Sequence, residues 1–143
     1  LFRAQYSSMM HLLVLYAAAG VILGHNFPFY LNFRGGKGIA ATAGLVLSFH
    51  PVMAVLGIIT FFGIFFTTHY VSLGSLAVYA GLMIEMVIFG QMGWFDLSQN
   101  QLIELYILMA FLTALAYWKH RGNIRRLLEG TERKTYLTKK SQQ

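Results

Sequence analysis

Residues 24–38 read GHNFPFYLNFRGGKG and separate an apolar stretch, residues 9–23, from a second and shorter one, residues 38–49. The glycines near the end of this loop let the backbone come close to a ligand, and Lys37 adds a positive charge. If the second stretch is a helix, its N-terminus faces the same ligand. The combination predicts a site for phosphate at a membrane surface.

The composition excludes an ordinary soluble domain, because 57% of the residues are hydrophobic and only 11% are charged, well below the quarter that is usual in globular proteins. Three further stretches approach the length that crosses a bilayer: residues 52–66, 73–89 and 102–118. The stretch at 38–49 is rich in Gly and Ala, which favours a helix packed against its neighbours. We expect an all-α integral membrane protein, a polytopic bundle with about five transmembrane helices.

If each stretch crosses once, three polar segments emerge on one side: residues 24–38, residues 67–72 and the segment after residue 118. Every Lys and Arg except Arg3 is then on that side, so the positive-inside rule makes it cytoplasmic. We expect residues 1–143 to form a single membrane domain in which residues 119–143 are a basic cytoplasmic tail.

The chain begins with Leu1, and its first apolar stretch follows closely, so we expect a fragment of a longer protein; a signal peptide is the alternative for that stretch. The sequence has no cysteine, which excludes disulfides and thiolate chemistry. The net charge of +6 could indicate nucleic acid. Since the charges gather where helices leave the membrane, anionic lipid headgroups are the expected partners and nucleic acid is not.

The loop at 24–38 is not a Walker A element, because Gly38 stands where that motif has Ser or Thr. The plain alternative is a membrane loop that uses Gly for turns and Arg or Lys for orientation. His25 begins the loop, and on the same face as Lys37 it becomes a candidate for phosphate binding or proton transfer.

Ser72 and Ser75 lie three residues apart where a helix begins, so they share one face. Ser72 is a candidate N-cap for that helix. Together the two hydroxyls are instead candidate donors to phosphate oxygens at the helix N-terminus. Both interpretations remain open on the sequence alone.

The tail adds His120, Asn123 and Glu132, which bring a titratable base, an amide and a carboxylate to the face that carries the loop. Gly130 ends a short interfacial helix there. For Glu132 we favour a structural role, paired with Arg or Lys to hold the loop. The His, Asp and Glu positions show no spacing typical of a metal site.

The loop, the Tyr-Val-Ser-Leu-Gly-Ser turn at 70–75 and the His-Arg-Gly-Asn-Ile segment at 120–124, followed by Gly130 and Glu132, resemble the bacterial acyl-phosphate:glycerol-3-phosphate acyltransferases of the PlsY type. The match runs from residue 24 to about residue 134. Full-length members are expected to have about seven transmembrane helices. An earlier cytoplasmic motif of the family has no counterpart in this sequence, so we expect an N-terminal truncation.

The resemblance implies transfer of a fatty acyl group from acyl-phosphate to the 1-hydroxyl of glycerol 3-phosphate, which gives lysophosphatidate for phospholipid synthesis. It implies no cofactor and no metal, and a multi-pass location in the bacterial inner membrane with motif loops and C-terminus cytoplasmic. The implied catalytic residues are His25, Lys37, His120 and Asn123. The implied phosphate-binding residues are Gly35, Gly36, Lys37, Gly38, Ser72 and Ser75, with Gly130 and Glu132 as structural support.

The main alternative is a small polytopic anion transporter subunit, in which the glycine loop is an entry element and Glu85, within the fourth apolar stretch, couples ion movement. A transporter should carry polar groups at mid-membrane depth in several helices. Here they concentrate at one interface, which favours an enzyme that acts on amphiphiles.

Overall fold

The computed structural model describes residues 9–136. Its helices are, in chain order, α2 (Met10–Asn26), the short 3-10 helix η2 (Phe29–Leu31), α3 (Ile39–Phe49), α4 (Pro51–Thr68), α5 (Val71–Gln91), α6 (Gln99–Lys119) and α7 (Arg121–Leu128). This part of the chain contains no β-strand, so the predicted all-α class is confirmed. Arg3 and residues 137–143, which include part of the predicted basic tail, lie outside the described residues.

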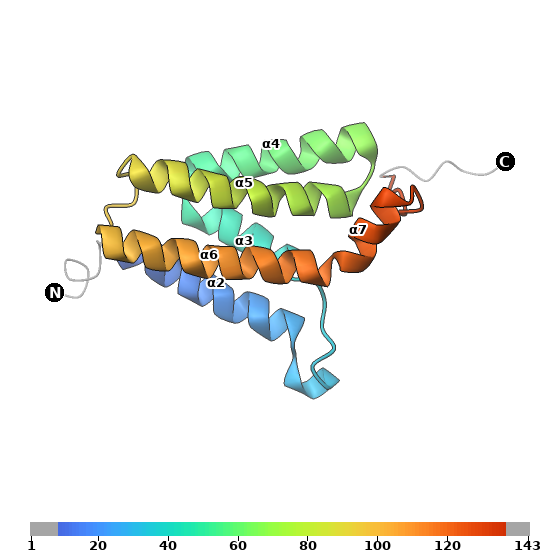
Figure 1. Ribbon diagram of the computed structural model, residues 1–143, viewed down its shortest axis with the longest axis horizontal. Coiled ribbons are helices and arrows are strands. Elements are labelled where there is room, and N and C mark those ends of the chain that lie inside the picture. The colour runs from blue at the N-terminus through green and yellow to red at the C-terminus, as the bar shows by residue number, and fades with distance from the viewer. Residues whose placement is uncertain (1–8, 137–143) are drawn as a thin grey trace.

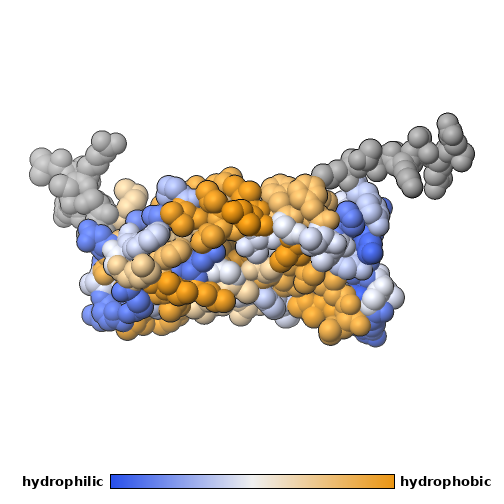
Figure 2. All heavy atoms as spheres, turned by 90° about the horizontal axis from the view of Figure 1, so that it is seen from above, coloured by the Kyte–Doolittle hydropathy of each residue, from blue (hydrophilic) through white to orange (hydrophobic). Residues whose placement is uncertain are grey.

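Four segments are long and apolar enough to cross a membrane: Met10–Leu31, Pro51–Thr68, Val71–Gln91 and Gln99–Lys119. The fifth apolar helix, α3, has 11 residues. At 1.5 Å per residue it is about 16 Å long, roughly half the thickness of the hydrocarbon core. The expected five helices are therefore four candidate spans and one short helix. Figure 2 shows the corresponding surface, a hydrophobic band with hydrophilic residues gathered at both ends.

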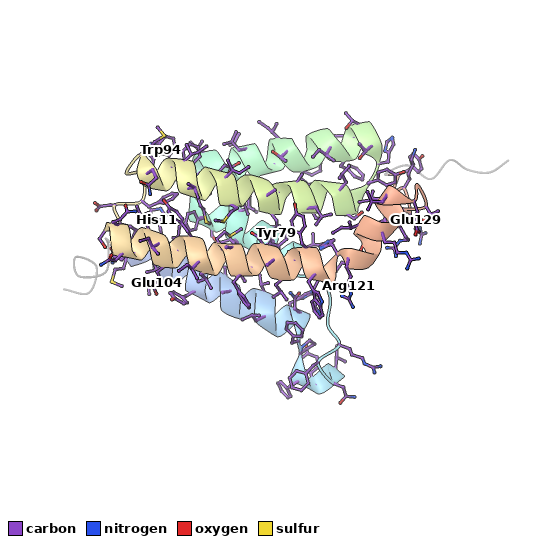
Figure 3. All side chains as sticks on the ribbon, in the orientation of Figure 1. His11, Tyr79, Trp94, Glu104, Arg121 and Glu129 are labelled. Atoms are coloured by element: carbon purple, nitrogen blue, oxygen red, sulfur yellow. The ribbon has the colours of Figure 1, made fainter. Side chains whose placement is uncertain are left out.

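The helices lie side by side, so that all connections fall at two ends of the bundle (Figure 1). One end holds residues 27–38, the turn between α4 and α5, and α7; we call it the loop end. The other holds the start of α2, the α3–α4 turn and the α5–α6 connection; we call it the far end. In Figure 3, Arg121 and Glu129 lie at the loop end, and Trp94 and Glu104 at the far end. The predicted gathering of three polar segments on one side is confirmed.

The core forms because each long helix turns one apolar stripe inward. Residues at three- and four-residue spacing share a helix face, and the buried residues follow that spacing. In α2 they are Leu12, Leu15, Ala19 and Ile22, and in α6 they are Leu102, Leu105, Met109, Leu112 and Ala116. These stripes pack together with α5, which contacts both α4 and α6.

The helix ends follow local chemistry. Pro51 begins α4 directly after His50, whose imidazole Nδ1 accepts a hydrogen bond from the Val52 N–H at 3.3 Å. At the loop end α4 continues to Thr68, and His69 ends it in the left-handed conformation at φ 62°. The polar segment expected at residues 67–72 is therefore shorter, because only His69 and Tyr70 lie between α4 and α5. Ser72 lies inside the first turn of α5 and Tyr70 is its N-cap, so the N-cap interpretation of Ser72 is wrong.

Candidate functional site

A chain of hydrogen bonds joins the glycine loop to the C-terminal segment at the loop end. The Lys37 ammonium donates to Asn123 Oδ1 at 2.5 Å, and Asn123 Nδ2 donates to Glu132 Oε1 at 2.6 Å. The cation and the carboxylate settle the orientation of the amide between them, because an ammonium can only donate and a carboxylate only accepts. One of the three N–H donors of Lys37 is used in this way. Within residues 9–136 the ammonium makes no second hydrogen bond, so an anionic ligand could take the other two donors.

Glu132 is the centre of this network. Its Oε1 also accepts a hydrogen bond from Ser72 Oγ at 2.8 Å, and its Oε2 pairs with Arg126 Nε at 2.7 Å. The carboxylate is only 6% exposed. Burial alone would raise the pKa of Glu132, but the hydrogen bonds from Asn123, Ser72 and Arg126 outweigh burial and lower it. Glu132 is therefore ionised at neutral pH and fixes the Asn123 amide, which in turn orients Lys37.

The tail reaches this position through Gly130 and a backbone contact. Gly130 adopts φ 69°, a left-handed conformation that suits glycine, just after α7 ends. The N–H groups of Thr131 and Glu132 then return to the Arg126 carbonyl at 2.8 and 3.1 Å. Farther along, the Thr135 N–H donates to the His69 carbonyl at 2.9 Å. These contacts hold Glu132 beside the start of α5.

His120 lies at the junction of α6 and α7 and is completely buried. Its Nδ1 is 2.8 Å from the Ala116 carbonyl oxygen, which can only accept, so Nδ1 carries the proton and Nε2 is an acceptor. Nε2 has no hydrogen-bond partner among residues 9–136. Burial lowers the pKa of His120; the Ala116 bond opposes this, while the charge of Lys37 adds to it. His120 thus offers a neutral, buried acceptor close to Lys37.

Gly35 and Gly36 allow a close approach between the loop and the end of α2. The N–H of Gly36 donates to the His25 carbonyl at 3.2 Å, and that of Gly35 donates to the Asn26 carbonyl at 3.3 Å. A Cβ at Gly36 would collide with the His25 ring, and one at Gly35 with the His25 carbonyl and Pro28. Both glycines let the loop fold back on the end of α2. The N–H groups of both glycines are occupied by these backbone carbonyls, and phosphate binding at Gly35 and Gly36 stays a prediction.

Gly38 and His25 complete the loop. Gly38 is the N-cap of α3 with φ 76°, so it directs the first N–H groups of that helix towards the loop end. The His25 ring packs against Gly36 and the residue is exposed. No hydrogen bond joins His25 to Asn123 or Glu132 in the part of the chain that the structure describes.

Two further residues at the site were not among the residues predicted from the sequence. Lys119 Nζ donates to the Asn26 carbonyl at 2.8 Å and lies 4.4 Å from the centre of the Phe27 ring, so it ties the loop to α6. Asn26 is 1% exposed and its side-chain amide has no partner within residues 9–136. The position of Lys119 directly before His120 could have marked it as a site residue. As one of many basic residues, however, it indicated only the orientation of the protein in the membrane. Asn26 gave no signal beyond its place in the loop.

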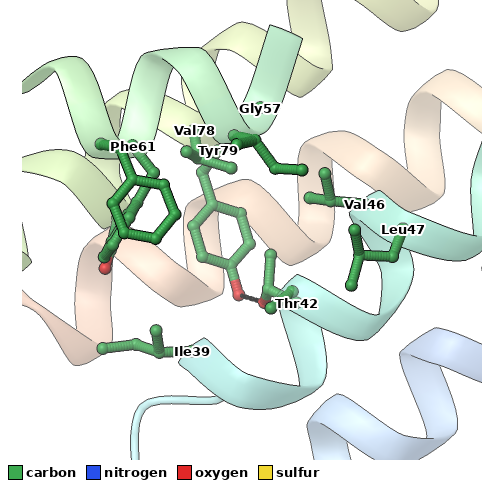
Figure 4. A pocket seen from close by; sticks show the side chains of 12 residues that line it. Ile39, Thr42, Val46, Leu47, Gly57, Phe61, Val78 and Tyr79 are labelled. Carbon is green, nitrogen blue, oxygen red and sulfur yellow. Dashed lines mark hydrogen bonds between the residues drawn. The ribbon is translucent and has the colours of Figure 1, made fainter. Parts of the chain in front are cut away.

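An apolar groove of about 380 Å³ opens beside this cluster, between α3, α4 and α5 (Figure 4). Ile39 and Ser75 line it nearest the loop end; Ile39 directly follows Gly38, and Ser75 is one turn beyond Ser72. Ser75 Oγ donates to the Val71 carbonyl at 2.9 Å. Ser72 Oγ is bound to Glu132 and Ser75 lies in the groove lining, so phosphate binding by this pair stays a prediction.

The remaining candidates lie away from this region. Within the described residues, no three His, Cys, Asp or Glu side chains are placed to hold a metal ion. Glu85 is half-buried in α5, and at 1.5 Å per residue it is about 20 Å farther along that helix than Ser72. The polar side chains that meet around Asn123 therefore belong to one end of the bundle.

Comparisons with known proteins identify the family to which the chain is similar. Residues 1–130 match the family described as glycerol-3-phosphate acyltransferase. A glycerol-3-phosphate acyltransferase of Halalkalibacterium halodurans is 43% identical over 121 residues, which is 82% of this chain and 55% of that protein. One from Rhizobium etli is 37% identical over 112 residues, which is 78% of this chain and 49% of that protein.

A solved structure shows the same fold. The crystal structure of PlsY, an integral membrane glycerol 3-phosphate acyltransferase, in its glycerol 3-phosphate form, has a TM-score of 0.69 and 30% identity. The match covers 80% of this chain and 52% of that one. The lysophosphatidic acid form of PlsY gives a TM-score of 0.68. The chain spans about half the length of the curated relatives it matches, and with a match over residues 1–130 it belongs to the glycerol-3-phosphate acyltransferase family.

Proposed function

We propose that this protein transfers a fatty acyl group from acyl-phosphate to the 1-hydroxyl of glycerol 3-phosphate, releasing lysophosphatidate and inorganic phosphate. The observation that carries the proposal is the Lys37–Asn123–Glu132 network, next to the buried acceptor of His120, at the mouth of an apolar groove. Both substrates bear phosphate and one bears an alkyl chain, so a cation beside an apolar groove suits both. The PlsY structures named for glycerol 3-phosphate and lysophosphatidic acid support the same substrate and product.

In the proposed reaction, Lys37 binds phosphate oxygens with its remaining N–H donors and stabilises the charge that develops on the leaving phosphate. His120 Nε2 accepts a hydrogen bond from the glycerol 3-phosphate hydroxyl and directs its oxygen at the acyl carbon. The new ester bond forms as the bond between acyl carbon and phosphate oxygen breaks, and the hydroxyl proton passes by way of His120 Nε2 to the leaving phosphate. An acyl-phosphate is an activated mixed anhydride, so no covalent enzyme intermediate is needed.

The acyl tail is proposed to lie in the groove between α3, α4 and α5. Its lining is almost entirely apolar, and its three hydroxyls are all bonded, those of Thr42 and Tyr79 to each other and that of Ser75 to the Val71 carbonyl. Because the lining is apolar, an alkyl chain can lie there without exposing its methylenes to water, which would cost about 0.8 kcal/mol for each one. The loop end is proposed to face the cytoplasm of a bacterial inner membrane, since its described basic residues, among them Arg34, Arg121 and Lys134, gather there.

The test of the reaction is a comparison of acyl donors. Because the chain covers about half of its relatives, it is expressed in membranes alone and also fused to the segment of the Halalkalibacterium halodurans relative that it does not cover. Labelled glycerol 3-phosphate is supplied with hexadecanoyl-phosphate or with hexadecanoyl-coenzyme A. The proposal predicts lysophosphatidate from the fusion with the phosphate donor only. Product from coenzyme A alone, or no product from a membrane-inserted fusion, would contradict it.

A further inference from the structure

The groove beside the active site has a definite end. Helices α3 and α4 are joined at the far end of the bundle by His50 alone, and they come into contact one or two turns from this joint. The contact is between Val46 and Gly57, where a Cβ on Gly57 would lie only 2.7 Å from Val46 Cγ1. The groove occupies the space between the helices on the loop side of this contact, and it therefore narrows to a wedge.

The lining residues fall at successive depths along this wedge. Ile39 and Ser75 are nearest the loop end, Thr42 and Tyr79 follow about one turn deeper, and Val46 and Gly57 close the groove. From Ile39 to Val46 the depth along α3 is about 10 Å, at 1.5 Å per residue. A side chain at each level can therefore limit how far a ligand reaches from the phosphate site.

One wall of the groove is open towards the membrane. Leu47 and Phe62 line it, yet they are 61% and 44% exposed. An alkyl chain can enter sideways from the bilayer while its phosphate stays at the loop end. The narrow apolar end suits a flexible chain, whereas a helix is about 10 Å wide with its side chains and cannot reach the Val46–Gly57 contact.

We propose that the Val46–Gly57 contact is the floor of the acyl groove and determines which acyl chain lengths the enzyme prefers. Gly57 is the specificity-determining residue, because its missing side chain allows Val46 to pack against the α4 backbone and leaves the space above open. This inference rests on the proposed acyl transfer and adds the residues that select among acyl donors.

Two substitutions should change the acyl chain length that the groove accepts, in opposite directions. Val46→Ala removes two methyl groups from the floor and should deepen the groove. Ala43→Leu, at intermediate depth on an exposed part of the lining, should block it above the floor. The matched controls are Val55→Ala and Ala114→Leu, exposed positions on α4 and α6 outside the groove.

The measurement is kcat/KM of the fused, membrane-inserted protein with dodecanoyl-, hexadecanoyl- and octadecanoyl-phosphate. Ala43→Leu should lower the ratio of octadecanoyl to dodecanoyl transfer by about tenfold, in line with the discrimination that apolar pockets reach. Val46→Ala should raise that ratio, and both controls should leave it unchanged. An unchanged ratio in both groove variants, or an equal loss for every donor, would overturn the inference while leaving the reaction intact. Failure of the unsubstituted fusion with every donor would instead overturn the reaction.

Discussion

His120 is the residue whose protonation state should govern the reaction. Burial lowers its pKa from the ordinary 6.5, and Lys37 contributes in the same direction. The neutral ring keeps Nε2 as an acceptor, so transfer should persist to a pH below 6.5 and fall as the pH drops through the lowered pKa. The measurement is kcat/KM against pH.

The control for this prediction is His120→Gln. A control is needed because the phosphate of the substrate also titrates in this range, with a pKa of about 6. Glutamine retains an acceptor oxygen but does not titrate in this range. The pH profile of this variant's residual activity should show only the titration of the substrate phosphate. The same acid limb in both proteins would remove His120 from the account.

Individual residues also show how far sequence reasoning reaches. The prediction that each apolar stretch crosses the membrane once was enough to place Lys37, Asn123 and Glu132 on one side. The apolar stretches alone decide which polar segments share a face. The roles of Gly35 and Gly36 could not be predicted in this way. Whether their N–H groups face a ligand or the end of α2 depends on the path of the loop, which no local pattern specifies.

At the level of elements, the glycine loop should act through its shape. A Cβ at Gly36 collides with the His25 ring, so Gly36→Ala should displace Lys37 from Asn123. A displacement of about 1 Å from the productive geometry can cost about a hundredfold in rate. We therefore expect kcat/KM for transfer to decrease by about tenfold to a hundredfold.

Gly24→Ala is the matched control, since a Cβ at Gly24 has nothing within 4 Å and the residue is in α2. Alanine has the higher helix propensity, so this variant should keep its activity and be at least as stable to heat. Equal activity of Gly36→Ala and the unsubstituted protein would show that loop shape does not position Lys37.

The helices themselves were predictable because lipid leaves few choices to the backbone. A long apolar stretch in a bilayer must satisfy its own N–H and C=O groups, which a helix does. The positions of the helix ends were predicted less accurately. The sequence places residues 67 and 68 in a polar segment between two helices, but their hydroxyls bond back to carbonyls within α4 and the helix continues to Thr68.

For the whole molecule, the orientation in the membrane can be tested directly because the sequence has no cysteine. Lys134→Cys places a thiol at the loop end and Met92→Cys places one at the far end, both at exposed positions. A membrane-impermeant maleimide should label Met92→Cys in intact spheroplasts and Lys134→Cys only after lysis. The reverse pattern would contradict a cytoplasmic loop end.

One network of side chains, which joins Lys37 in the loop to Glu132 in the tail through Asn123, is proposed to carry the acyl transfer. The most direct test compares Lys37→Ala with Arg125→Ala, which removes the same charge from an exposed pair with Glu129 at the same end. The assay is transfer of labelled glycerol 3-phosphate into lysophosphatidate from hexadecanoyl-phosphate by the fused protein. Loss of a charge-stabilising donor should lower kcat by about a hundredfold or more in Lys37→Ala, with little change in Arg125→Ala. Equal activity of the two variants would contradict the account.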